Sequence, residues 1–457
     1  MRSDAPVRGP GGPPLAYRLS YLLGSAGYTI PFFLIALYWI NFYNPPAHDD
    51  LPILLPRGPI FLGISILSVI IVLARLADIV VDPLIARLSD RSQNRRGRRL
   101  PMMEKSFLPA AACMLLVFLP PQAGVGVINV VWVTVLLILG VTFFSAYVTP
   151  FLAHMDVLCR DEDDRISLSM YQGLGESLGV ILAGQAPLIW SVAQYGGLDV
   201  LTSRQMSFFV LCSLAALLML FPILALRGTE AGIHVPSETS VGQLVRRVLS
   251  SRDFAVFLVV YCIFIACVEM VQAGAYYYVV VLLELDSSML SIFIAIMVPS
   301  SMLTAPVAAN AARRFGKRRV ILGVFLILAV LLALISELGH YPIGAAIQAG
   351  IIFFLGGIPL GGMTILVMAV VTEQIQRARN IYGEAPEAIF VAGKNLSYKI
   401  GIAVGAGLFA SVALLGKDRG HDVGIRLSAI VALGLCLLAA VLFAWFYGRG
   451  RPDPEEL

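Results

Sequence analysis

Long apolar stretches recur from one end of this 457-residue chain to the other, and they restrict its possible folds more than any other feature. Hydrophobic residues make up 58% of the sequence and charged residues only 14%. A helix needs about 20 apolar residues to cross a bilayer, and only helices and closed barrels satisfy their backbone groups there. We therefore expect an all-α membrane protein without a soluble domain of useful size.

The apolar stretches predict twelve transmembrane helices. They lie near residues 16–42, 58–88, 103–120, 126–156, 166–194, 205–226, 253–284, 288–312, 318–338, 342–373, 386–415 and 424–447. The first stretch is too long for the apolar core of a cleaved signal peptide, so we expect it to be retained as a span.

Basic residues in the loops predict the orientation of these spans. The loops after the second and eighth stretches are rich in Arg and Lys, whereas loops of the opposite parity, such as 120–126 and 285–288, are nearly free of them. Because basic loops stay on the cytoplasmic side, we expect both termini in the cytoplasm.

The longest polar connection falls in the middle of the chain and separates six stretches from six. We therefore predict two six-helix bundles, with the following parts: a cytoplasmic tail at 1–15, an N-terminal bundle at 16–226, a cytoplasmic linker at 227–252, a C-terminal bundle at 253–447 and a cytoplasmic tail at 448–457. The segment Asp82–Arg91 has a weaker counterpart at Ala305–Arg314, and such repeats are typical of duplicated six-span transporters. Ala305 occupies the position of Asp82, so the second half lacks that acid.

Two acids, Asp78 and Asp82, lie one helical turn apart inside the second stretch. A charge near the bilayer centre costs on the order of 3 kcal/mol on insertion scales, so the pair needs compensation. Helical geometry places Arg75 and both acids within an arc of roughly 60°. The pattern favours a monovalent cation held by carboxylate oxygens, or a shared proton. The alternative is an Arg75–Asp78 ion pair that only fixes helix packing.

Other polar residues also fall inside apolar stretches. Lys399 would neutralise the acid pair, hold an anionic part of a substrate, or extend toward the membrane surface. Glu176 and Glu269 would be functional acids or acids bonded to a nearby amide or hydroxyl. For Tyr276–Tyr278 an interfacial aromatic belt is the favoured interpretation over the lining of a solute cavity.

The basic loop from Arg87 to Arg99 has two interpretations. It would latch the two halves through ion pairs at the cytoplasmic surface, with Asp90 as the acidic member beside Arg91 and Arg98. Alternatively, its charges only set the topology.

Enzyme chemistry is disfavoured by the distribution of reactive side chains. The five histidines are scattered and no nucleophile with a paired base is visible. The six cysteines show no metal-ligand spacing, so we expect no cofactor other than a coupling ion.

The second stretch and its basic loop, Arg75 through Pro101, resemble the glycoside-pentoside-hexuronide:cation symporters of the major facilitator superfamily, the melibiose permease-like transporters. The likeness extends to Leu19–Gly27, Pro150-Phe151, Arg165 with Tyr171, and Lys399–Gly401. It implies the major facilitator fold. It also implies a Na⁺, Li⁺ or H⁺ site at Asp78 and Asp82, with a family threonine matched by Ser145, a family asparagine replaced by Val81 and the family lysine matched by Lys399.

By the same resemblance, this chain lacks the polar groups with which the family binds sugar. The resemblance places Thr29 at a first-span acid, Val148 at a fourth-span acid, Leu152 at a tryptophan and Gly173 at a fifth-span arginine, or Gln172 there if the alignment shifts by one. Discriminating a polyol needs buried polar partners, so a galactoside is not favoured. Sodium-dependent lysolipid symporters of the same branch also resemble the chain.

We predict a cation-coupled secondary active symporter of a small sugar-like or glycoside-like solute, working by alternating access. Cation binding at Asp78, Asp82 and Ser145 would favour the outward-facing state, Arg75 would orient the acids and Lys399 would couple the charges. The alternatives are a lysolipid or other amphiphile symporter, a uniporter or exporter, and a receptor or scaffold that transports nothing. We expect a monomer in the plasma membrane with no nucleic-acid partner.

Overall fold

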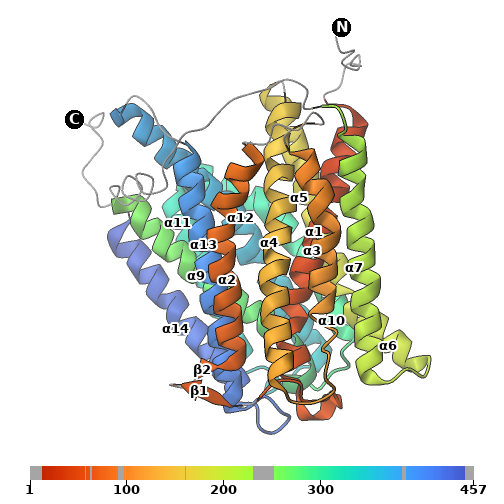
Figure 1. Cartoon of the computed structure of the whole chain (residues 1–457). Coiled ribbons are helices and arrows are strands. Elements are labelled where there is room, and N and C mark those ends of the chain that lie inside the picture. The colour runs from red at the N-terminus through yellow and green to blue at the C-terminus, as the bar shows by residue number, and fades with distance from the viewer. Residues whose placement is uncertain are drawn as a thin grey trace. The chain divides into compact units, whose positions relative to one another are not determined.

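A computed structural model of the chain describes residues 13–56, 58–61, 64–90, 97, 99–159, 161–229, 252–382 and 387–447. The long helices are α1 (Leu15–Tyr43), α2 (Ile66–Asp90), α3 (Leu100–Leu116), α4 (Val127–Leu158), α5 (Glu162–Gly184), α6 (Ala186–Tyr195), α7 (Val200–Ala225), α9 (Arg252–Tyr277), α10 (Met289–Phe315), α11 (Lys317–Ser336), α12 (Ala345–Tyr382), α13 (Glu387–Val412) and α14 (Val423–Phe446), as labelled in Figure 1. Short elements are η1 (Ala47–Asp49), η2 (Tyr278–Leu282), η3 (Ala413–Leu415) and the strands β1 (Pro59–Phe61) and β2 (Ile64–Ser65).

Ten helical segments in the described part of the chain are long and apolar enough to cross a membrane. Two other helices fall outside that set, because α3 has 17 residues and the middle of α2 carries Arg75, Asp78 and Asp82. The predicted all-helical membrane fold is confirmed. The count of twelve spans and the cytoplasmic termini stay predictions.

Two predicted spans begin or end differently in the structure. The second was predicted from residue 58, but α2 begins at Ile66 and a small antiparallel hairpin of β1 and β2 precedes it. The fifth was predicted as one helix over 166–194, but α5 ends at Gly184 and α6 starts at Ala186 with Pro187 in its first turn. Proline fits a helix start and disfavours a helix interior, which explains the break.

The chain folds into two compact units. Unit 1 consists of the described residues of Met1–Tyr43, Asp50–Pro56 and Leu76–Pro236, and unit 2 of those of Asn44–Asp49, Arg57–Arg75 and Ser237–Leu457. The first part of α2 therefore belongs to unit 2 and the remainder to unit 1. Most of the predicted linker 227–252 lies outside the described residues.

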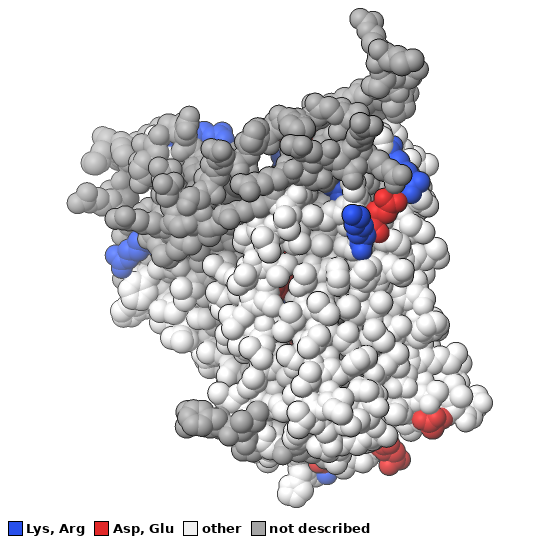
Figure 2. Space-filling model, viewed as in Figure 1, with Lys and Arg blue, Asp and Glu red and all other residues white. Residues whose placement is uncertain are grey.

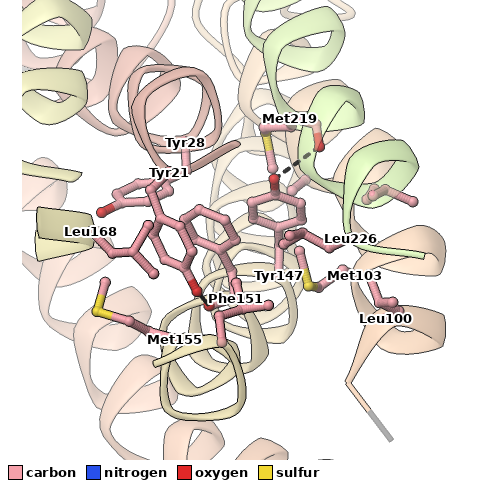
Figure 3. Close-up of a cluster of buried hydrophobic side chains, with 13 residues drawn as sticks. Tyr21, Tyr28, Leu100, Met103, Tyr147, Phe151, Met155, Leu168, Met219 and Leu226 are labelled. Atoms are coloured by element: carbon pink, nitrogen blue, oxygen red, sulfur yellow. Dashed lines mark hydrogen bonds between the residues drawn. The ribbon is translucent and has the colours of Figure 1, made fainter. Parts of the chain in front are cut away.

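Unit 1 contains an aromatic core to which α1, α3, α4, α5 and α7 contribute (Figure 3). Tyr21 stacks on Phe151 with ring centroids 4.8 Å apart, and Tyr147 stacks on Phe151 at 5.8 Å. The Tyr21 hydroxyl donates to the carbonyl of Phe151 at 3.2 Å, and the Tyr147 hydroxyl to that of Met219 at 2.8 Å. The core is thus apolar in its rings and hydrogen-bonded at its polar tips, as buried tyrosines require.

Two glycines one turn apart let α5 approach α1 closely. A Cβ atom added to Gly175 would lie 2.1 Å from the carbonyl oxygen of Leu22. One added to Gly179 would lie 2.6 Å from the Cβ of Thr29 and 2.8 Å from the carbonyl oxygen of Ala26. Small residues at this spacing are typical of membrane helices whose backbones touch.

The same contact recurs in unit 2 between α13 and α9. A Cβ atom on Gly401 would lie 2.6 Å from the carbonyl oxygen of Cys262. One on Gly405 would lie 2.3 Å from the carbonyl oxygen of Ala266 and 2.8 Å from the Cβ of Glu269. Each unit thus presses a glycine pair of one helix onto two carbonyls of another.

The start of α2 is tied to α13 within unit 2. The Ser68 hydroxyl donates to the carbonyl of Gly407 at 2.7 Å and lies 2.8 Å from the hydroxyl of Ser411. Ser65 is bonded to Ser68 by a further hydroxyl contact of 2.7 Å. These bonds attach a segment from early in the sequence to one from its end.

On the face shown in Figure 2, the coloured Lys, Arg, Asp and Glu residues lie toward two opposite ends, and the area between them is almost free of charge. On α4 the exposed residues Val131, Val135 and Leu139 recur every four positions. This is an apolar stripe of the kind that faces lipid.

Two helices that begin outside the apolar region have aspartate caps. The Asp161 carboxylate accepts from the N–H of Asp164 at 2.8 Å, and that of Asp199 from the N–H of Thr202 at 3.0 Å. Side-chain and backbone hydrogen bonds from Thr202 hold the pKa of Asp199 below its usual value. These caps satisfy amide groups that a helix start leaves unpaired.

Candidate functional site

The predicted acid pair lies on α2, where Asp78 is buried and Asp82 is half-buried one turn further on. Ser145 of α4 is buried too, and its hydroxyl donates a hydrogen bond of 3.2 Å to Oδ1 of Asp78. The structure therefore brings Asp78 and Ser145 together inside unit 1. Carboxylate and hydroxyl oxygens are ligands suited to a hard cation. Their role as cation ligands stays a prediction.

The described residues contain no group of three or more His, Cys, Asp and Glu side chains that could hold a metal ion.

The two predicted cationic residues belong to unit 2. Arg75 is half-buried on α2 and acts electrostatically on the carboxyl group of Glu269, which is buried in α9. Lys399 is half-buried on α13. Sequence reasoning considered Arg75 only with the acids of its own helix, because nothing in the sequence shows that Glu269 lies close by.

The four positions matched to the family's sugar-binding groups lie in unit 1. Thr29 is buried where α1 meets Gly179, and Val148 packs against the aromatic core. Leu152 is exposed, and a Cβ atom on Gly173 would meet nothing within 4 Å. None of these four side chains brings a charged group to the site, and Gly173 leaves open space beside α5.

Tyr28, which the sequence analysis missed, lies one position before Thr29, and Gln172, the alternative match to the fifth-span arginine, lies one position before Gly173. The Tyr28 hydroxyl donates to Oε1 of Glu176 at 2.5 Å, and Nε2 of Gln172 donates to the same oxygen at 2.9 Å. The Tyr28 ring lies edge-on to Phe144 with centroids 6.0 Å apart. Glu176 is thus bonded to a hydroxyl and an amide, which is one of the two interpretations its sequence position allowed.

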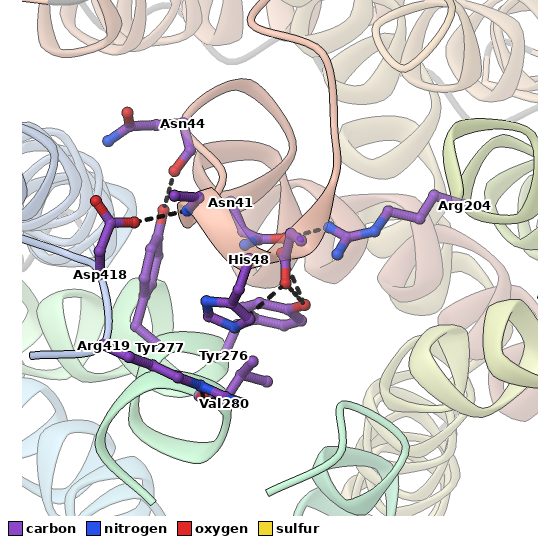
Figure 4. Close-up of polar contacts among 11 residues, drawn as sticks. Asn41, Asn44, His48, Arg204, Tyr276, Tyr277, Val280, Asp418 and Arg419 are labelled. Carbon is purple, nitrogen blue, oxygen red and sulfur yellow. Dashed lines mark hydrogen bonds and ion pairs between the residues drawn. The ribbon is translucent and has the colours of Figure 1, made fainter. Parts of the chain in front are cut away.

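The interpretation of Tyr276–Tyr278 as an interfacial belt is wrong, because all three side chains are at most 2% exposed. The Tyr276 hydroxyl donates to both carboxylate oxygens of Asp49, at 3.1 and 2.9 Å (Figure 4). The Tyr277 hydroxyl donates to the carbonyl of Asn44 at 2.7 Å. These tyrosines fasten the segment after α1 to unit 2 and do not face lipid.

The predicted gating residues are only partly described. Arg91 and Arg98 lie outside the described residues, and Asp90 is the last residue of α2. The latch between the two halves therefore stays a prediction.

Apolar helices that carry buried acids, a hydroxyl bonded to one of them and an arginine that acts electrostatically on another define a class of protein. Ionisable groups inside such helices mark ion or substrate pathways, so the class is that of multi-pass membrane transport proteins.

Comparison with known proteins identifies the family within this class. The family model described as MFS/sugar transport protein matches residues 17–447, and the chain belongs to this family. Its members are membrane transporters and not enzymes, and the resemblance noted in the sequence is confirmed.

Two curated relatives match most of the chain. A lactose permease of Lactobacillus delbrueckii subsp. bulgaricus is 23% identical over 453 residues, covering 94% of this chain and 67% of that protein. A raffinose carrier protein of Pediococcus pentosaceus is 20% identical over 442 residues, covering 94% and 66%. The chain thus spans about two thirds of the length of these relatives.

Solved structures share the fold at low sequence identity. A D-xylose-proton symporter superposes with a TM-score of 0.66 at 13% identity, covering 96% of this chain and 99% of the other. The nucleoside transporter NupG superposes with a TM-score of 0.65 at 12% identity, covering 95% and 100%. These similarities establish the major facilitator type of fold and nothing about the solute.

Proposed function

We propose that this protein is a cation-coupled symporter that carries a sugar or glycoside across the plasma membrane by alternating access. The observation that supports it most directly is the hydrogen bond from Ser145 to Asp78. It holds oxygens from two helices side by side in the interior of unit 1. A Na⁺ ion, or a proton shared between acids, would bind there with Asp82 as a further ligand.

A sugar is the favoured solute because unit 1 contains polar groups that a polyol needs. Tyr28, Gln172 and Glu176 gather a hydroxyl, an amide and a carboxylate, next to the ring of Phe144. Specificity for hydroxyl groups comes from such buried partners. The names of the relatives, a lactose permease and a raffinose carrier protein, support the same class of solute.

An amphiphile is less well supported than the sequence alone suggested. Val148 replaces a polar residue of sugar carriers, but its side chain packs against the aromatic core of unit 1. It therefore contributes to the packing of the unit, and its apolar character does not require an apolar solute.

Charged residues of unit 2 complete the proposal. Arg75 would keep the acids of α2 ionised and oriented, and Lys399 would respond to the charge at the cation site. In this arrangement both termini lie in the cytoplasm and the protein acts as a monomer with twelve spans.

Uptake into proteoliposomes tests the proposal. Purified protein is reconstituted, and uptake of radiolabelled lactose and raffinose is measured with an inward Na⁺ gradient, an inward proton gradient, or none. We expect gradient-driven uptake in the wild type and its loss in Asp78→Asn and Asp82→Asn, because each removes a charged ligand. Any residual uptake should need at least about tenfold more Na⁺ for half-maximal rate, equivalent to about 1.4 kcal/mol.

Asp156→Asn is the matched control. Asp156 also lies on a helix of unit 1, but its side chain is 62% exposed and pairs with Arg165 at 3.7 Å on the surface. This variant should transport like the wild type. Gradient-driven uptake that survives both Asp78→Asn and Asp82→Asn would show that these acids do not couple a cation.

A further inference from the structure

Glu269 is an acid in the middle of a transmembrane helix. The span that contains α9 runs from Arg252 to Leu282, and Glu269 lies close to its centre with 6% of its surface exposed. An ionisable residue at this depth is costly and is retained where it serves ion or proton movement.

Within the described residues, Arg75 of α2 is the charged group that acts electrostatically on the carboxyl of Glu269. That carboxyl has no hydrogen bond there. On α13, Tyr398 and Lys399 come just before Gly401, which contacts α9. The phenol group of Tyr398 interacts electrostatically with that of Tyr261, which lies two turns before Glu269 on α9.

The thiol of Cys267, two residues before Glu269 on α9, and that of Cys436 on α14 are engaged elsewhere. The Cys267 thiol donates to the carbonyl of Ala432 at 3.3 Å, and the Cys436 thiol to that of Phe325 at 3.4 Å. Arg75 is therefore the described residue whose charge acts electrostatically on the carboxyl of Glu269.

The internal repeat shows that helix packing does not require an acid at this position. In unit 1, Gly179 of α5 contacts the carbonyl of Ala26 on α1 and also the Cβ of Thr29, which lies three residues after Ala26. In unit 2, Gly405 of α13 meets the Cβ of Glu269 on α9 with the same spacing. Thr29 and Glu269 therefore occupy equivalent positions. Because an uncharged residue makes the contact in unit 1, the carboxyl of Glu269 needs a reason other than packing.

We propose that Glu269 is a proton-binding site of unit 2, separate from Asp78 and Asp82, with Arg75 as the counter-charge of its ionised form. The carboxylate takes a proton from water and becomes a neutral acid, and it returns the proton to water when it ionises. No electron transfer or further reactant is involved. The charge of unit 2 changes by one with each protonation.

A proton fits this position better than a metal cation. A bound cation needs several oxygen ligands, and Glu269 supplies one carboxylate without a neighbouring oxygen donor. A proton requires a single oxygen atom.

Infrared difference spectroscopy of the purified, full-length protein tests this site without any solute. Spectra are recorded while the pH is lowered, and the carbonyl stretching band of a protonated carboxyl is followed. A protonated Glu269 without a hydrogen bond gives a band at the high-frequency end. We expect this band to be lost in Glu269→Gln and kept, at a shifted frequency, in Glu269→Asp.

Two further variants make the result decisive. Glu337→Gln makes the same change at a side chain that is 66% exposed and should leave the band as in the wild type. In Arg75→Gln the band should persist to higher pH, because loss of a positive charge favours the neutral acid. Arg75→Gln also serves if Glu269→Gln fails to elute as a single folded species.

An unchanged band in Glu269→Gln, or a band whose pH range is the same with and without Arg75, would overturn the proposal. The Glu269→Gln result does not bear on Asp78 and Asp82, whose coupling role is tested by uptake. The proton site and the cation-coupled function can therefore fail independently.

Discussion

The glycine contact between α5 and α1 predicts opposite effects for one substitution at two neighbouring positions. In Gly175→Ala the new methyl group would lie 2.1 Å from the carbonyl oxygen of Leu22, which is 1.3 Å inside the 3.4 Å at which ordinary contact begins. That oxygen belongs to a helix backbone and cannot rotate away, so α1 and α5 must separate. In Gly173→Ala the new methyl group meets nothing within 4 Å.

The two energies differ in sign. Overfilling a packed contact costs about 1–3 kcal/mol, so Gly175→Ala should lower the stability of unit 1 by that amount. Alanine is favoured over glycine in a helix by up to about 1 kcal/mol, so Gly173→Ala should be neutral or stabilising. Separation of the helices would also lengthen the bond from Tyr28 on α1 to Glu176 on α5.

The assay is thermal unfolding of the purified variants in detergent, followed by the fluorescence of a thiol-reactive dye that reports exposure of the buried cysteines. We expect a lower midpoint for Gly175→Ala and an equal or higher one for Gly173→Ala. Equal losses at both positions would refute the reasoning, since they would show that helix flexibility and not close approach selects glycine on α5.

Three further predictions concern single side chains. Tyr28→Phe removes the hydroxyl bonded to Glu176 and should weaken sugar binding about tenfold, equivalent to about 1.4 kcal/mol, in a titration monitored by thermal shift; unchanged affinity would place the sugar elsewhere. Ser145→Ala removes one oxygen of the proposed cation site and should raise the Na⁺ concentration for half-maximal stabilisation about tenfold, whereas an unaltered Na⁺ titration would exclude Ser145 as a ligand. Since hydrogen bonds from Thr202 lower the pKa of Asp199, its ionised cap contributes stability above the unfolded value of about 3.9 and loses it as the pH falls further. Asp199→Ala should therefore lower the thermal midpoint at neutral pH and differ less from the wild type in acid, and a constant difference across this range would contradict the linkage.

The helices were predictable where apolar residues run without interruption. The first stretch, predicted at 16–42, forms α1 over Leu15–Tyr43, because its apolar run continues on both sides of Pro31. The breaks before Ile66 and at Gln185 escaped prediction, since an average over many residues hides a single glycine or proline. Local backbone chemistry decides where such a stretch stops being helical.

The candidate site was predictable only where charge made it visible. Asp78 stands out in an apolar helix, and the resemblance to known symporters pointed to Ser145. The bond between Tyr28 and Glu176 joins residues 148 positions apart, and no periodicity in the sequence reports such a contact. The resemblance pointed to Thr29 and so passed over Tyr28 one residue before it, whereas Gln172 was named only as the alternative to Gly173.

Burial of the tyrosines at 276–278 could not be predicted for a related reason. An aromatic cluster near a span end has the same composition whether it meets lipid headgroups or a protein loop. The deciding partners are Asn44 and Asp49, which lie far away in the sequence. Only the folded chain shows that the tyrosine hydroxyls are bonded to protein.

The composition of unit 2 limits how this gene can be divided or recombined. The unit takes Asn44–Asp49 and Arg57–Arg75 from the early part of the chain, and Ser68 anchors the second of these pieces to α13. A fragment that starts at Ser237 therefore encodes an incomplete unit, although it begins after six predicted spans. A chimaera between two relatives would keep unit 2 intact only if these two short pieces came from the same parent as the C-terminal half.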